Sequence, residues 1–118
     1  EQIDFIANMG VGREDEMLAY NLADMERLPD LWQVMKQAWR SGNLTALEEI
    51  AATPLRDDFP EVYKTLLVDR NNAWLPQIEA LSTTAEVAFV LVGMLHLVGD
   101  DGLLAMLASR GYKITQLP

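Results

Sequence analysis

Cysteine is absent from the 118 residues, and histidine occurs once, as His96. The lack of cysteine excludes disulfides, zinc–thiolate sites and thiol nucleophiles. Basic residues are also few, since 9 Lys and Arg against 18 Asp and Glu leave a formal net charge of −9. No basic stripe is present, so nucleic acids are not expected as partners. The same charge balance disfavours binding to anionic membrane surfaces.

Long hydrophobic runs are absent as well. No apolar stretch approaches the ~20 residues that a membrane span needs, so we expect no membrane insertion. No signal peptide is recognisable, and because the chain starts at Glu1 we expect its natural N-terminus to lie further upstream. Hydrophobic residues make up 50% and charged residues 23%, which is typical of a globular protein. The length suits a single domain over residues 1–118.

The first two thirds of the sequence has helical periodicity. Amphipathic helices are predicted over residues 13–28, from Asp30 to the stop at Gly42, and over 43–52. A loop is expected at 53–58, and a further helix follows it. Because Pro76 removes a backbone donor, this last helix is expected to kink or break near Asn72.

The last third reads as a strand-helix-strand unit. Residues 87–92 are apolar without alternation, which is typical of a strand covered on both faces. An amphipathic helix around 103–110 follows, and 112–117 alternates as a second strand. The predicted class is therefore a helix-dominated α/β fold, with a helical part at 1–81 and the strand-helix-strand unit at 82–118. Two strands alone are marginal, so we expect a fragment of a larger α/β domain.

His96 follows the predicted strand in a glycine-rich segment with Gly93 and Gly99. Ligands commonly bind just past the carboxyl end of a strand, and glycine permits the turn that would aim His96 there. A neutral imidazole there could bind a metal together with Asp69, Asp100 or Asp101. Alternatively, the ring hydrogen-bonds a backbone carbonyl and fixes the loop.

Other polar and aromatic residues have two interpretations each. Arg70 either orients a carboxylate or forms a surface ion pair with a neighbouring acid such as Asp69. Asn71 and Asn72 either bind substrate backbone or cap a broken helix. Asp100 and Asp101 are expected to cap the following helix rather than bind metal. Core or groove packing is expected of the three tryptophans, which are Trp32, Trp39 and Trp74.

Several of these motifs resemble the TraB/GumN family. The resemblance lies in the Gly-x-x-His at Gly93–His96, in the glycines that follow it, in Asp69-Arg70-Asn71 and in Glu1-Gln2. It covers nearly the whole chain through about a dozen specific positions. Members share two Gly-x-x-His elements and a Glu/Arg pair. This chain has only the second Gly-x-x-His, and Asp69 stands where Glu is usual, with a carboxylate one methylene shorter.

The resemblance implies a metal-dependent hydrolase of peptides or proteins, since the family includes the Tiki proteases. His96 would ligate a divalent transition metal (Mn, Co or Zn), while Arg70 would orient or stabilise charge and Asp69 would supply a carboxylate. The isolated chain would be inactive, and the family suggests a bacterial envelope location. The alternative is a helical module that binds a protein or peptide through Trp32 and Trp39. Separately, the exposed edges of a two-stranded remnant would favour homodimerisation.

Overall fold

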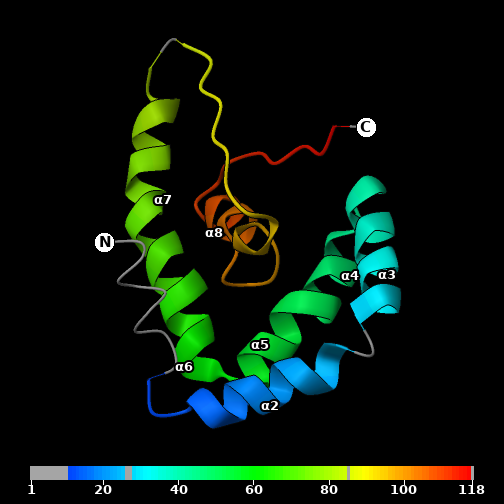
Figure 1. Ribbon diagram of the computed structural model, residues 1–118. Helices are drawn as coiled ribbons and strands as arrows, with labels where there is room; N and C mark the ends of the chain where they lie inside the picture. The colour runs from blue at the N-terminus through cyan, green and yellow to red at the C-terminus, as the bar shows by residue number, and fades with distance from the viewer. Residues whose placement is uncertain (1–10, 26–27, 85, 118) are drawn as a thin grey trace.

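Within the residues that the computed structural model describes, 11–25, 28–84 and 86–117, every regular element is a helix (Figure 1). No strand is found in these three ranges. The predicted α/β class and the strand-helix-strand unit over 82–118 are therefore wrong, whereas the helical character of the earlier part is confirmed.

The middle of the chain forms two long helical stretches separated by Phe59. The first joins α4 (Leu44–Leu47), a π turn (Glu48–Ala52) and α5 (Thr53–Asp58). It includes the residues that were expected to form a loop. The π turn lies directly before Pro54, where a wider turn leaves room for the pyrrolidine ring against the preceding carbonyls.

The second stretch joins α6 (Pro60–Tyr63), a π turn (Lys64–Val68) and α7 (Asp69–Ser82). The expected break near Asn72 is absent, because α7 runs through Pro76, which is exposed. The extra residue of the π turn rotates everything after it by about 100° relative to a regular helix. This rotation determines which α7 side chains face the rest of the molecule.

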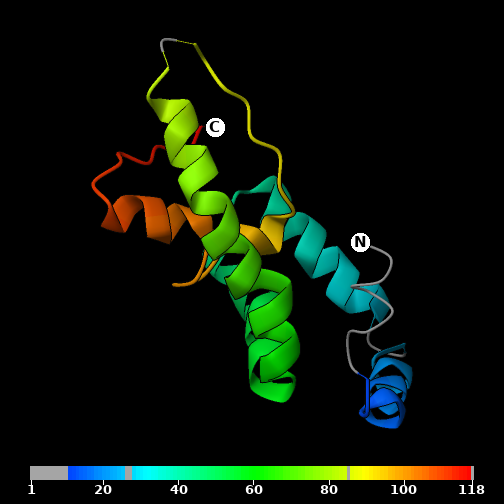
Figure 2. The same ribbon diagram turned by 90° about the vertical axis from the view of Figure 1, so that its left-hand side faces the viewer.

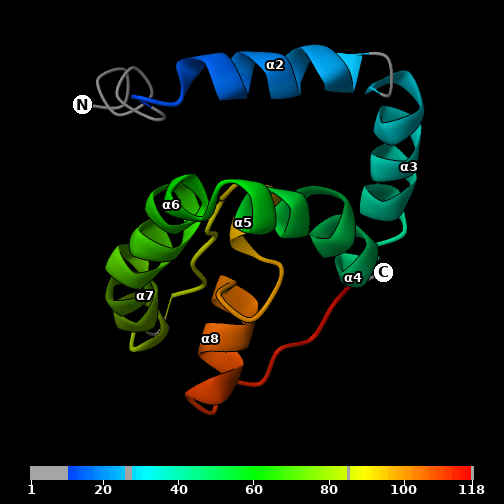
Figure 3. The same ribbon diagram turned by 90° about the horizontal axis from the view of Figure 1, so that it is seen from below.

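The helices enclose a small core between two arms. In Figures 1 and 3, α7 stands on one side and α3 (Leu28–Arg40) with α4 on the other, and α8 (Leu103–Ser109) lies between them. Six residues form the main buried cluster, namely Ala38, Leu47, Ala52, Tyr63, Leu67 and Val98. The radius of gyration is 16.1 Å, against about 13.5 Å for a compact domain of this length. The structure is therefore open.

Helix α2 (Glu14–Met25) lies at the edge of the structure (Figures 2 and 3). The predicted apolar stripe is more than half exposed, at 59% for Leu18, 57% for Leu22 and 62% for Met25. Its recorded ring contact is Tyr20 edge-on against Phe59, with centroids 5.1 Å apart. Periodicity thus predicted the helix but not its burial.

The two segments expected to be strands are extended but unpaired within the described ranges. Val87, Phe89 and Leu91 are 101%, 89% and 84% exposed, so the run 87–92 is not a buried strand. Residues 112–117 are likewise irregular. A strand forms only when its N–H and C=O groups meet a neighbouring strand, and in the described residues these segments have none.

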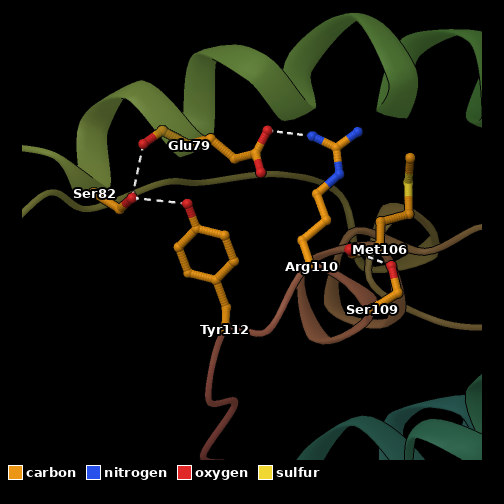
Figure 4. Close-up of polar contacts among 6 residues, drawn as sticks. All are labelled: Glu79, Ser82, Met106, Ser109, Arg110 and Tyr112. Atoms are coloured by element: carbon orange, nitrogen blue, oxygen red, sulfur yellow. Dashed lines mark hydrogen bonds and ion pairs between the residues drawn. The ribbon is translucent and has the colours of Figure 1, made fainter.

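The C-terminal ends of α7 and α8 are tied together by polar contacts (Figure 4). Arg110 forms an ion pair with Glu79, and the hydroxyls of Ser82 and Tyr112 are 3.1 Å apart. These contacts hold α8 against α7. The turn that precedes α8 is thereby placed beside the first half of α7, at Asn71 and Trp74.

Candidate functional site

The centre of the candidate site is Asn71 on α7. Its side chain is 1% exposed, and its Nδ2 donates to the carbonyl of Asp101 at 2.7 Å and more weakly to the carbonyl of His96 at 3.4 Å. Both carbonyls belong to the segment from the 3-10 turn (Met94–His96) to the start of α8. One amide group therefore fastens this segment to α7.

The same amide orients His96. Asn71 Oδ1 lies 2.7 Å from His96 Nδ1. Because Nδ2 of Asn71 donates to two carbonyls, Oδ1 must be the acceptor, and the network assigns the proton of the ring to Nδ1. Nε2 is then the unprotonated nitrogen and carries the free lone pair of the ring. In metalloproteins, a hydrogen bond to one ring nitrogen sets the orientation of a ligating histidine in this way.

The environment also keeps this imidazole neutral. His96 is 7% exposed, and desolvation by burial lowers the pKa of the ring, with the positive charge of Arg70 lowering it further. The tautomer and the lowered pKa both leave Nε2 without a proton. Near neutral pH this nitrogen can therefore act as an acceptor.

Three side chains stack beside Asn71. The ring of Trp74 lies 4.7 Å from that of His96, measured between centroids, and the guanidinium of Arg70 lies 4.7 Å from the Trp74 ring centroid. Arg70 and Trp74 are four residues apart on one helix, so they share a face. The structure therefore brings two predicted site residues, His96 and Arg70, together through Trp74.

Asp69 does not join this group. Both of its carboxylate oxygens accept from Lys64 Nζ at 2.8 Å, and the two side chains are about half exposed, at 49% and 59%. It lies two positions before Asn71, which places it on a different side of the helix. Its recorded polar contact is this surface ion pair.

The glycines serve the turn differently from the expectation. Gly93 has φ −63° and ψ 146°, a conformation open to any residue, whereas Gly99 has φ +75°. Gly102, which contributed to the family resemblance but was not predicted as a turn-forming glycine, is the tightest position, since a Cβ there would lie 2.5 Å from the Val98 carbonyl oxygen. Close backbone approach, not an unusual dihedral angle, requires glycine at this position.

The acids of the turn do not cap α8. The N-cap residue of α8 is Gly102, with no side-chain cap hydrogen bond. The carboxylate of Asp101 instead accepts from the hydroxyl of Tyr63 at 3.1 Å. Burial and this carboxylate raise the pKa of Tyr63 to about 12. This contact is a second link between the turn and the second helical stretch.

The described donor side chains near His96 are too few for a metal site. In the parts of the chain that the structure describes, no group of three or more His, Asp or Glu side chains could hold a metal ion. A catalytic metal site needs about three protein ligands. His96 fits as one ligand, but the described residues do not complete a site.

A hollow of about 270 Å³ lies beside Trp74. Trp74, Ile78 and Leu81 of α7 line one side, and Val90 to Val92 line the other. It is mainly apolar and large enough for an apolar side chain. The stacked group thus has an apolar hollow next to it.

The site joins the two motifs that carried the family resemblance. The glycine-rich turn with His96 is fastened to α7 by the buried Asn71, and Arg70 lies beside them. The chain belongs to the TraB/PrgY/gumN family, whose sequence model matches residues 1–116. No curated protein and no solved structure matches the chain. Glu1 and Gln2, which contributed to the resemblance, lie outside the described residues.

Among the described helices, none has the length and apolar character needed to cross a membrane.

Sequence reasoning missed the pairing of Asn71 with His96. Asn71 was considered a substrate-binding or capping residue, although its side chain is buried and bonded within the protein. Its position next to Arg70 and three residues before Trp74, on a helix with an apolar face, was the sequence feature that could have indicated an inward side chain. The partner, 25 positions away, could not be read from that spacing.

Proposed function

We propose that this chain contributes to a metal-dependent, peptide-hydrolysing site in which His96 gives Nε2 to a divalent transition metal, Mn, Co or Zn. The observation that supports the proposal is the 2.7 Å contact between His96 Nδ1 and Asn71 Oδ1. It leaves the free lone pair on Nε2, and the lowered pKa favours the unprotonated ring. Nitrogen with carboxylate ligation suits these metals.

The other ligands would come from outside the described residues, because these hold no group of three. When bound, such a metal polarises a peptide carbonyl. The groups described here act around it. Asn71 fixes the ring, and Arg70 brings a positive charge that favours a substrate carboxylate or a developing oxyanion. Asp69 is not assigned a metal-binding role, because Lys64 binds both of its oxygens.

The test is elemental analysis of the purified protein, compared between the native sequence, His96→Ala and Asp69→Asn. Stoichiometric metal should be lost in His96→Ala and kept in Asp69→Asn, because the Asp69 carboxylate of the native protein is paired with Lys64. Metal retained in His96→Ala would refute the assignment, as would unchanged peptide hydrolysis in that variant.

Protein or peptide binding without catalysis is the second candidate. It is favoured by the exposure of Trp39 and Trp32, at 66% and 57%, on α3. Exposed tryptophans are typical of interaction surfaces. If the native protein carries no metal, this candidate replaces the first, and sedimentation velocity would then show whether the partner is a second copy.

A further inference from the structure

Two bases on α3 lie together and form no ion pair with any acid among the described residues. Arg13, Arg56, Lys64 and Arg110 each form an ion pair with a described acid. Lys36, Arg40 and Lys113 form none within the described ranges. Of these three, Lys36 and Arg40 are four residues apart on one helix and share a face. In a chain with 18 acids and 9 bases, these two neighbouring positive charges on α3 have no ion-pair partner in the described ranges.

Both bases line a hollow in the protein surface. It has a volume of about 440 Å³ and is lined by Lys36, Arg40, Gln33, Gln37 and Ser41. Every lining side chain can donate a hydrogen bond, and two carry positive charge. Such a surface matches a carboxylate better than a neutral or cationic group.

This polar hollow adjoins an apolar one. Arg40 and Ser41 also line a second hollow of about 360 Å³, whose other walls include Trp39, Leu47, Met94 and Leu97. Met94 and Leu97 flank His96 in sequence and belong to the turn that Asn71 fastens. A continuous surface therefore leads from the bases on α3, across Trp39, to the turn of the candidate site.

We propose that this surface binds an acidic peptide, with a carboxylate on Lys36 and Arg40 and a neighbouring apolar side chain in the hollow beside Trp39. Charge complementarity selects the occupant, because neither base is paired with an acid in the described ranges. That the bound peptide is a substrate rests on the proposed function, whereas the binding itself requires no metal.

Arg40 also lies in the last turn of α3, where a positive charge stabilises the helix end. That role would affect unfolding and would not distinguish acidic from neutral peptides. Lys36 is one turn earlier and is the cleaner position to change. The experiment therefore compares ligands as well as variants.

The probe is fluorescein-Gly-Gly-Leu-Glu-Glu, measured by fluorescence anisotropy in EDTA at 50 mM salt. Binding should weaken about threefold to tenfold in Lys36→Gln, and Lys113→Gln, which removes the same charge outside both hollows, should leave it unchanged. Replacing Glu-Glu by Gln-Gln should weaken binding similarly, and replacing Leu by Gly should remove the apolar contribution. An amidated C-terminus distinguishes a terminal carboxylate from side-chain carboxylates as the bound group.

No binding, equal binding of a Gln-Gln peptide with an amidated C-terminus, which carries no peptide carboxylate, or equal loss in Lys36→Gln and Lys113→Gln would each overturn the proposal. His96→Ala should bind the probe as the native protein does, because His96 lines neither hollow. Failure of metal binding and failure of peptide binding are therefore separate results.

Discussion

The substitution Asn71→Ala tests the central link of the candidate site. It removes two hydrogen bonds of 2.7 Å, to the Asp101 carbonyl and to His96 Nδ1, and one weaker bond of 3.4 Å. Each normal bond contributes about 1 kcal/mol net, and each buried partner left unsatisfied costs about 1–3 kcal/mol. The side chain is 1% exposed, so water cannot replace the lost amide without rearrangement. We expect the free energy of unfolding to fall by about 3 kcal/mol.

The neighbouring residue provides a matched control. Asn72 is exposed on the same helix, so Asn72→Ala makes the same chemical change without breaking the buried network. Alanine is the better helix former by up to about 0.7 kcal/mol, a gain common to both variants. Asn72→Ala should therefore be neutral or slightly stabilising.

The assay is urea unfolding at pH 7.5, followed by circular dichroism at the helix minimum. A loss of 3 kcal/mol is a large fraction of the 5–15 kcal/mol typical of a domain, and it would be seen as a lower midpoint at unchanged slope. Nitrogen NMR of His96 adds a direct readout, because the native Nδ1–H tautomer should become a mixture in Asn71→Ala. If the two alanine variants unfold within 0.5 kcal/mol of each other, the network does not hold the turn.

Two further predictions concern the turn. Gly102→Ala should destabilise the protein by more than about 1 kcal/mol, because the new Cβ would lie 2.5 Å from the backbone oxygen of Val98. Gly93→Ala should be tolerated, because its Cβ would meet its nearest atom at 3.7 Å; thermal melts of the two variants would check this, and equal melting temperatures would contradict it. Because the pKa of His96 is lowered in the folded protein, the unfolded chain binds a proton on this imidazole more tightly than the folded chain does. This contribution to stability is fully present above the unfolded pKa near 6.5 and declines as pH falls below that value. A His96→Gln variant should lack this decline in urea titrations between pH 5 and 7.5, and an identical pH dependence in both proteins would refute the linkage.

The local features of the fold could be predicted from sequence. Periodicity and stop residues located α2 and α3 because both signals act within a few residues. The same rules failed at 53–58 and at Pro76, where proline was taken as a breaker although the helix continues through both. A π turn before Pro54 and an exposed position for Pro76 are details that spacing does not reveal.

The long-range features could not be predicted. Residues 87–92 have strand composition, but a strand also needs a neighbour, and composition carries no information about where that neighbour lies. The contact between Asn71 and His96 spans 25 positions and depends on the rotation that the π turn at Lys64–Val68 introduces. Asp69 was predicted at the site from the family resemblance of Asp69-Arg70-Asn71, yet an ion pair with Lys64, five positions earlier, holds its carboxylate at the surface.

The largely exposed run 87–92 also affects how the protein behaves in solution. These six residues are apolar and β-prone, without charge, proline or glycine, which is the composition of segments that stack into cross-β aggregates. The net charge of −9 opposes such self-association by repulsion between copies. Salt screens that repulsion, since its range shrinks from about 10 Å at 0.1 M to about 3 Å at 1 M ionic strength. Colloidal stability of this protein therefore depends on keeping its acidic charge unscreened.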